Sequence, residues 1–146
     1  SKHVPGHGCA NSDSHFNLPI VYKKKSKLYK EDFSLFKKIN SNFMMTAHIL
    51  YKNIDSKNLA TFSRNIISQI IRKKFNFKGI LISDDISMKA LSKNLSANAN
   101  KALNAGCNLV LYCGGNIKES SKLLKNLRRI DDFTIKKTYQ FYNFLR

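Results

Sequence analysis

Three short, almost continuous apolar runs are the main hydrophobic pattern of the chain, at residues 43–51, 79–82 and 109–112. A run without alternation is typical of a strand that is buried on both faces of a parallel sheet. Each run becomes polar at its C-terminal end: at His48, at Ser83, Asp84 and Asp85, and at Gly114, Gly115 and Asn116. The pattern therefore predicts parallel strands whose polar ends gather at one edge of a sheet.

Between these runs, apolar residues recur at three- and four-residue spacing, which predicts amphipathic helices. The clearest stripe consists of Leu59, Phe62, Ile66, Ile67, Ile70 and Ile71. Asp55, Ser56 or Asn58 is its expected cap. Further helices are expected over 31–41, up to Gly106, over 117–127 and over 135–145. Gly106 is suited to end a helix because it tolerates a left-handed backbone.

Strand and helix alternate at about 30 residues per unit, which indicates a parallel α/β architecture. Two versions are compatible with this pattern: an open doubly wound sheet, or part of an eight-stranded barrel. Three strands and a piece of a fourth would make a poor sheet but a good half barrel. A barrel would also explain why reactive residues follow successive strands, because its active sites are assembled at the strand ends.

The length suits one domain, since 146 residues suffice for one ordinary core. The chain begins with Ser1 and carries its most reactive-looking loop at once, so we expect it to be the tail of a longer protein. No apolar run approaches the roughly 20 residues that span a bilayer, so we expect no membrane partner. Cys9, Cys107 and Cys113 lack metal-ligand spacing and are expected to be reduced thiols in a cytoplasmic protein.

The net charge of +17 raises the possibility of a nucleic-acid partner. The lysines, however, are scattered through every segment, and no nucleic-acid-binding motif accompanies them. Abundant Asn, Ile and Ser point to compositional drift instead. We therefore expect no nucleic-acid partner and keep a basic nucleic-acid-binding module only as an alternative, because it depends on charge alone.

Candidate chemistry is concentrated in two places. Residues 1–15 contain three of the four histidines, together with Asp13, in a loop rich in Gly, Asn and Ser. The second place is the Asp84-Asp85 pair after the second apolar run. Because side chains alternate across a strand, only one of these two carboxylates faces a site, and the residues alone do not choose between them.

Several segments together resemble the second half of the catalytic domain of bacterial beta-N-acetylhexosaminidases of glycoside hydrolase family three. They are residues 2–8, 13–15, 44–48, 77–88 and 105–108, in matching order and spacing. The resemblance covers nearly the whole chain and weakens after about Arg128. It implies a partial (β/α)8 TIM barrel of roughly three and a half βα units, with residues 1–146 as the C-terminal half of the domain and the N-terminal half missing.

The resemblance also implies an activity and its residues. Members of the family remove terminal N-acetylglucosamine from cell-wall muropeptides in the cytoplasm, with retention of configuration, in peptidoglycan recycling. No cofactor or metal is implied. The implied roles are nucleophile for Asp84, acid/base for His15, its carboxylate partner for Asp13, and substrate contact for Lys2, His3 and His48. Asp85 is then expected to accept hydrogen bonds from neighbouring loops.

The residue types suit this chemistry. A retaining glycosidase needs one group that attacks the anomeric carbon and a second that transfers protons. A carboxylate at a strand end can be the first. A histidine, with an unperturbed pKa of about 6.5, can be the second, and a nearby carboxylate can orient it.

A metal-dependent hydrolase is the other enzymatic alternative. His3, His7, His15, His48 and Asp84 are its candidate ligands. Zinc requires three or four ligands close together, and this spacing matches no zinc motif. The absence of a first half of the barrel leads to a further expectation: the chain alone is inactive or poorly folded, because a half barrel exposes two unpaired strand edges.

Overall fold

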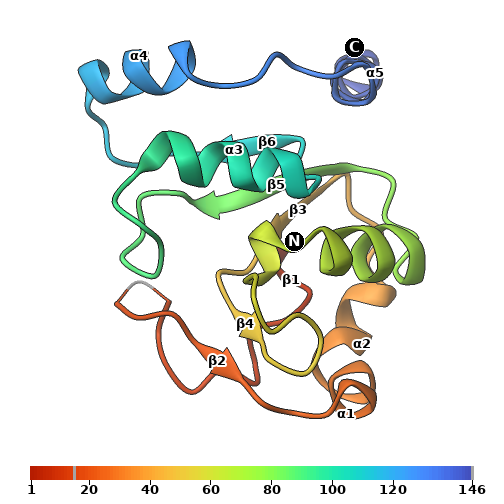
Figure 1. Ribbon diagram of the computed structural model, residues 1–146. Helices are drawn as coiled ribbons and strands as arrows, with labels where there is room; N and C mark the ends of the chain where they lie inside the picture. Colours follow the sequence, from red (N-terminus) through yellow and green to blue (C-terminus); the bar gives the residue numbers. More distant parts are fainter. Residues whose placement is uncertain (15, 146) are drawn as a thin grey trace.

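A computed structural model describes residues 1–14 and 16–145, and its centre is a four-stranded parallel sheet (Figure 1). The order is β1-β3-β5-β6, and all pairs are parallel. The strands are β1 (Lys2–Val4), β3 (Phe43–Thr46), β5 (Ile80–Asp85) and β6 (Leu109–Leu111). The predicted parallel α/β class is confirmed, and the polar ends of the strands do meet at one edge.

A second, two-stranded parallel sheet pairs β2 (Ile20–Val21) with β4 (Leu50–Tyr51). The apolar run at 43–51 was expected to be one strand, and this is wrong. The chain changes partners in the middle of the run: the Ala47 amide donates to the Val4 carbonyl, whereas the Leu50 amide donates to the Pro19 carbonyl. One apolar run therefore contributes to two sheets.

The helices follow the predicted stripes with local differences. They are α1 (Lys25–Lys30), α2 (Asp32–Lys37), the 3₁₀ helix η1 (Ala60–Phe62), the π-helix η2 (Ile66–Lys74), α3 (Leu95–Ala105), α4 (Ile117–Lys125) and α5 (Asp132–Phe144). Gly106 ends α3 with φ of 120°, as expected. The stripe at 59–71 is interrupted at Ser63, whose hydroxyl accepts from the Ile66 amide and donates to Asp55. Asp55 thus supports the turn indirectly and does not cap the helix.

The main core lies between the four-stranded sheet and the helices η2, α1 and α2. Phe33 is central to it and is fully buried. Its ring meets the rings of Tyr29, Tyr51 and Phe75 edge-on, with centroid distances of 5.4, 5.2 and 6.2 Å. These contacts join α1, α2, β4 and η2 into one packed unit beside the N-terminal loop.

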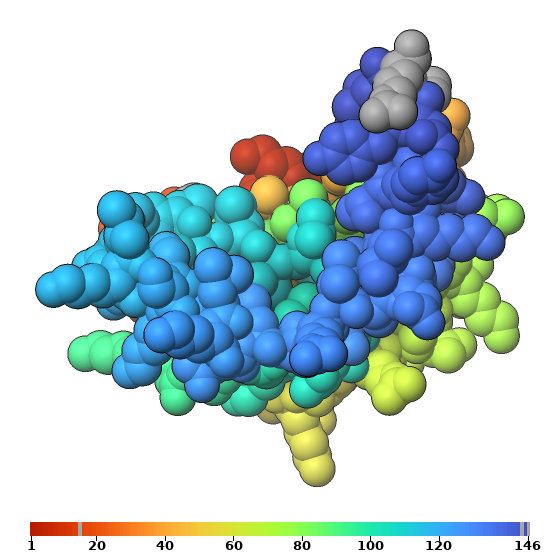
Figure 2. Space-filling view, turned by 90° about the horizontal axis from the view of Figure 1, so that it is seen from above, coloured from red at the N-terminus to blue at the C-terminus, as the bar shows by residue number. Residues whose placement is uncertain are grey.

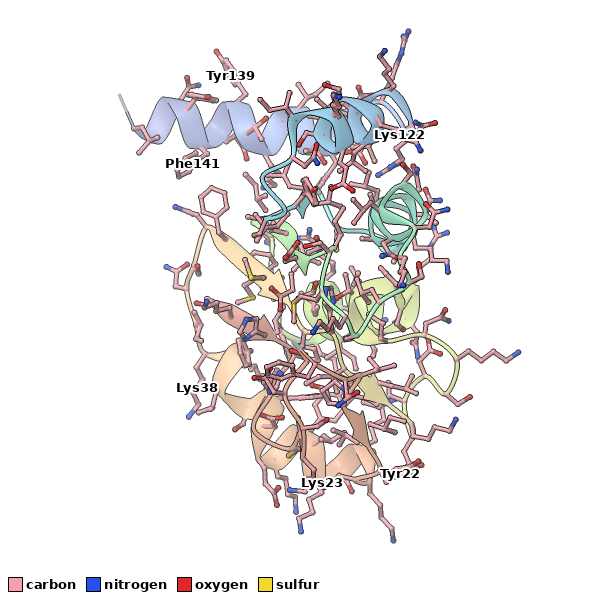
Figure 3. The ribbon with its side chains drawn as sticks, turned by 90° about the vertical axis from the view of Figure 1, so that its left-hand side faces the viewer. Tyr22, Lys23, Lys38, Lys122, Tyr139 and Phe141 are labelled. Carbon is pink, nitrogen blue, oxygen red and sulfur yellow. The ribbon has the colours of Figure 1, made fainter. Side chains whose placement is uncertain are left out.

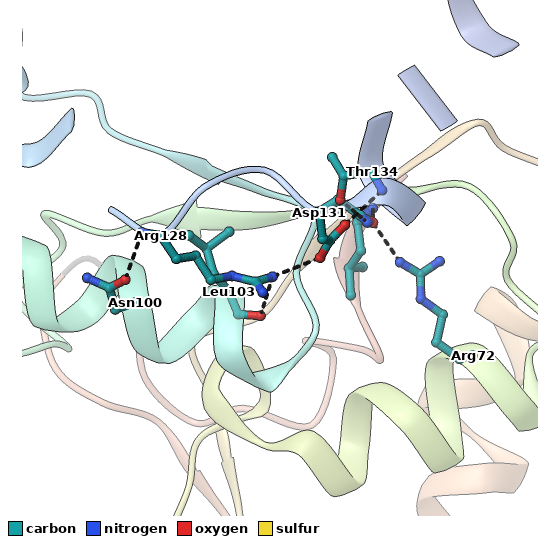
Figure 4. A network of polar contacts seen from close by, with 8 residues as sticks. Arg72, Asn100, Leu103, Arg128, Asp131 and Thr134 are labelled. Atoms are coloured by element: carbon teal, nitrogen blue, oxygen red, sulfur yellow. Dashed lines mark hydrogen bonds and ion pairs between the residues drawn. The ribbon is translucent and has the colours of Figure 1, made fainter. Parts of the chain in front are cut away.

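The C-terminal helices are attached at fewer points. Phe141 of α5 points toward β3, where its ring meets Phe43 at 4.7 Å, while Tyr139 points away (Figure 3). A polar network binds the start of α5 to the rest: Arg128 bonds to Asp131 and the Leu103 carbonyl (Figure 4). The same network continues from Thr134 through Asn108 to Arg72.

Between α4 and α5 the surface is hollowed over β6 (Figure 2). This groove has a volume of about 510 Å³, and its lining comes from β6, from α4 and from the segment that joins α4 to α5. In the described residues, β6 pairs only with β5 and β1 only with β3, so both are edge strands of this sheet. No helix in the described part of the chain has both the length and the apolar character needed to cross a membrane.

Candidate active site

A histidine and a carboxylate from different strands meet at the carboxyl edge of the sheet. His3 is the middle residue of β1, and Asp84 lies near the end of β5, with β3 between the two strands. His3 Nε2 is 3.6 Å from Asp84 Oδ2. The side chains are 28% and 13% exposed, so both are accessible to a ligand. The fold thus joins two residues that are 81 positions apart in the chain.

Asp84 and Asp85 have different environments. Asp84 Oδ1 accepts from the Asp85 amide at 2.9 Å, and its other oxygen is directed toward His3. Asp85 Oδ1 accepts from the Ser87 and Cys113 amides at 3.0 and 3.1 Å. Asp85 therefore holds the loops after β5 and β6, as expected, and Asp84 is the carboxylate that faces the neighbouring histidine.

A chain of contacts links Asp84 to the N-terminal loop. The rings of His3 and His7 lie 5.7 Å apart, and His7 Nε2 is 3.4 Å from the Ser14 hydroxyl. Ser14 is buried with 4% exposure, although its neighbour Asp13 is exposed. His15 lies outside the described residues. Ser14, the residue before His15, is thus linked to His3 through the side chain of His7.

The loop itself is fixed to α2. Asp32, the first residue of α2, accepts from the Gly8 and Cys9 amides at 3.1 and 3.3 Å. The Tyr51 hydroxyl also donates to the Gly6 carbonyl. A Cβ atom at Gly6 would lie 2.6 Å from both oxygens of Asp32, so only glycine permits this close approach.

His48 is in contact with the same strand end but is not accessible. The residue lies shortly after the end of β3, and its side chain is fully buried, with 0% exposure. Nδ1 is 2.8 Å from the Thr61 hydroxyl and Nε2 is 3.0 Å from the Asp85 carbonyl. Burial is the main cause that lowers the pKa of His48 below its ordinary value, against the opposing charges of Asp84 and Asp85. With both ring nitrogens engaged inside the protein, His48 presents no free group to a substrate in this arrangement.

The other predicted substrate contact, Lys2, is exposed at the start of β1. Sequence reasoning missed Asp32 and Thr61, because a carboxylate at the start of a helix and a threonine in an apolar stripe usually have local roles. In residues 1–14 and 16–145, no three His, Cys, Asp or Glu side chains are grouped so that they would hold a metal ion. The three cysteines are free thiols.

Comparison with known proteins defines the class first. The parallel α/β fold is similar to that of a solved glycoside hydrolase family 3 beta-N-acetylglucosaminidase from Paenibacillus sp., with a TM-score of 0.83 and 28% identity over 95% of this chain and 28% of that one. Residues 1–138 match the family described as Glycosyl hydrolase family 3 N terminal domain, and the chain belongs to this family.

Two groups of relatives support this membership. Beta-hexosaminidase of Haemophilus influenzae is 38% identical over 118 residues, which cover 77% of this chain and 33% of that protein. CbsA of Thermotoga neapolitana superimposes with a TM-score of 0.87 and 30% identity, over 99% of this chain and 37% of that one. NagZ of Neisseria gonorrhoeae in complex with N-trifluoroacetyl-D-glucosamine gives a TM-score of 0.80 and 29% identity, over 93% and 40%. The chain thus spans about a third of the length of the curated relatives that it matches.

Proposed function

We propose that this chain supplies the C-terminal half of a (β/α)8-barrel glycosidase domain that removes terminal β-N-acetylglucosamine with retention of configuration. The observation that carries the proposal is the approach of His3 Nε2 to Asp84 Oδ2 at the carboxyl edge of parallel strands. The family match and the hexosaminidase relatives support the same reaction class. The substrate class that we propose is a cell-wall saccharide of the muropeptide type, and the expected partner is the N-terminal half of the same barrel.

The first step forms a bond to the protein. Asp84 Oδ2 attacks the anomeric carbon, and the bond from that carbon to the leaving oxygen breaks. His15 gives its proton to the leaving oxygen, so the aglycone departs as a neutral alcohol. Asp13 holds the imidazolium that donates this proton, as a carboxylate does in other histidine-dependent hydrolases.

The second step releases the sugar. His15, now neutral, takes a proton from water while the water oxygen attacks the anomeric carbon and the bond to Asp84 breaks. The two displacements invert the carbon twice, so the product retains its configuration. Lys2 and His3 hold sugar hydroxyls during both steps, and the position of His3 beside Asp84 suits this role.

The complete gene product that carries this chain provides the test. It should hydrolyse an aryl β-N-acetylglucosaminide, and chelators should leave the rate unchanged. Asp84→Asn removes the nucleophile and should lower kcat by about 1,000-fold or more. A kcat within a few-fold of wild type in this variant would refute Asp84 as the nucleophile.

The proton donor is tested by leaving-group dependence. His15→Ala should lower turnover strongly for substrates with poor leaving groups, because these need protonation. An activated aryl leaving group departs without a proton, so part of the loss should disappear on that substrate. Equal losses on both substrates would contradict the role of His15.

A further inference from the structure

We propose that His48 is a positioning residue: a buried, neutral imidazole that carries its proton on Nε2 and holds the backbone of Asp85, and through it the carboxylate of Asp84. This inference depends on the proposed function, because it assigns His48 to the support of the nucleophile. It replaces the expectation that His48 contacts the substrate.

The first step is an assignment of protons. A carbonyl oxygen only accepts, so the 3.0 Å contact between His48 Nε2 and the Asp85 carbonyl requires a proton on Nε2. Nδ1, 2.8 Å from the Thr61 hydroxyl, then either accepts from that hydroxyl or carries a second proton. The first choice makes the ring neutral, and the second makes it a cation.

Two observations favour the neutral ring. The Thr46 hydroxyl lies 2.9 Å from the Thr61 hydroxyl, so it can donate to the oxygen whose own proton goes to His48 Nδ1. The Thr61 hydroxyl has two acceptors within reach, the Ala47 carbonyl at 3.0 Å and His48 Nδ1 at 2.8 Å, and the shorter contact favours Nδ1. All donors then run in one direction, from Thr46 through Thr61 and His48 to Asp85. These three donor side chains have 0% exposure, and a charge in such a place is costly without a direct counter-ion. Burial has the largest effect and lowers the pKa of His48. The hydrogen bond to the Asp85 carbonyl and the charges of Asp84 and Asp85 act in the opposite direction, and His3 lowers the pKa further.

His48 holds the backbone of Asp85 in place. Residue 85 is bound at both ends of its backbone: its carbonyl accepts from His48, and its amide donates to Asp84 Oδ1 at 2.9 Å. A shift of the Asp85 peptide would therefore turn the Asp84 carboxylate away from its direction toward His3. A displacement of about 1 Å at a reacting group can cost on the order of 100-fold in rate. His48 thus acts on the reaction without contact with the sugar.

Matched substitutions separate the two ring nitrogens. In His48→Gln the amide nitrogen reaches the position of Nε2 and keeps the donor to Asp85. In His48→Asn the shorter side chain keeps only a partner for Thr61. We expect kcat to fall by about 10- to 100-fold in His48→Asn with KM nearly unchanged. His48→Gln should recover most of this loss. Thermal unfolding of each variant identifies any loss that is due to misfolding.

Steady-state kinetics of the complete gene product decide between the two roles. An increase in KM at constant kcat in His48→Asn would identify His48 as a substrate contact and overturn the proposal. Equal kcat values in the Gln and Asn variants would also overturn it, because the donor to Asp85 would then have no effect.

A spectroscopic test needs no activity, so it remains informative if the proposed reaction is wrong. Imidazole nitrogens of ¹⁵N-labelled histidine distinguish the two neutral tautomers and the cation by NMR. Comparison with His48→Gln assigns the signals. We expect the Nε2–H tautomer at neutral pH, and Thr61→Val should change its signals because the partner of Nδ1 is lost. A cation or an Nδ1–H tautomer at neutral pH would overturn the assignment.

Discussion

Two residues of the same type can have different environments in this protein because different groups donate hydrogen bonds to them. Asp84 and Asp85 are neighbours on one strand, yet amides from two loops bind Asp85 while one oxygen of Asp84 is left beside His3. Their sequence position predicts only that they face opposite sides of β5. The choice between them needs the partners, and these come from β1 and from the loop after β6. A pattern within one strand contains no information on either partner.

Cys107 offers a prediction on stability at alkaline pH. Burial raises the pKa of its thiol to about 12, whereas a thiol in an unfolded chain titrates near pH 8.5. Between these values the native state holds a proton that the unfolded state has lost. The stabilisation is therefore fully present below about pH 8.5 and decreases as the pH rises toward about 12.

The measurement is the free energy of unfolding of the complete gene product and of Cys107→Ala at a series of pH values. Their difference should decrease by about 1 kcal/mol per pH unit above about pH 9. Tyr51, whose pKa burial also raises well above its ordinary value, is present in both proteins and cancels. A difference that stays constant over this range would contradict a buried, protonated thiol.

Secondary-structure elements act on the site through the loop after β1. This loop carries Asp13 and Ser14, and it is fixed to the start of α2 by the two amides that donate to Asp32. The loop is thereby held against a helix that packs in the main core through Phe33. Residues that the proposed reaction needs are thus positioned by a carboxylate that takes no part in it.

Asp32→Ala tests this anchor. The loss of two hydrogen bonds to a charged acceptor should lower the free energy of unfolding by about 1–3 kcal/mol. Because the loop would lose its fixed position, kcat should fall by on the order of 10-fold, more than KM changes. Hydrogen exchange should become faster at the Gly8 and Cys9 amides in particular.

Glu31→Ala is the matched control, because Glu31 is the adjacent acidic residue and forms an exposed ion pair with Lys23 at 2.9 Å. Exposed pairs contribute little. The control should leave kcat and the exchange of the Gly8 and Cys9 amides unchanged. Similar effects in both variants would show that Asp32 acts through the helix and not through the loop.

Some of the secondary-structure elements can be predicted from sequence patterns, and others cannot. The buried strand β5 and the end of α3 at Gly106 follow from the sequence pattern. Apolar spacing also predicted the positions of α4 and α5, although most of the apolar side chains that define these two stripes are exposed. The small sheet of β2 and β4 was not predicted, because a strand of two residues is too short to show a periodic pattern. The π-helix η2 keeps the buried isoleucines at 66, 67, 70 and 71, so burial was predictable while the helix type was not.

At the scale of the whole molecule, two edges of the sheet and several helical faces lack an internal partner among the described residues. The edge strands are β1 and β6, and the groove over β6 is lined by apolar side chains. Large apolar residues are exposed on the C-terminal helices and their connections: Ile117, Leu124, Ile130, Phe133, Ile135, Tyr139, Tyr142 and Leu145. Parallel strands in α/β proteins are normally covered on both faces, and bare edges promote association.

These surfaces predict how the isolated chain behaves. Residues 1–146 expressed alone should associate, and turnover of an aryl β-N-acetylglucosaminide should be at least on the order of 100-fold below that of a complete barrel, because the site that we propose needs both halves of the barrel. The charge of +17 opposes this association by repulsion between copies.

Ionic strength separates the two effects. At about 0.1 M salt the Debye length falls to about 10 Å, so the repulsion is screened while apolar contacts and strand pairing persist. Association measured by light scattering should therefore increase with salt, whereas assembly driven by opposite charges would decrease. Addition of the N-terminal half of the barrel should suppress the association and restore turnover, because in the proposed barrel that half would pair with the edge strands β1 and β6. A monomer that unfolds cooperatively and hydrolyses the substrate without that half would contradict the expectation that the site requires both halves.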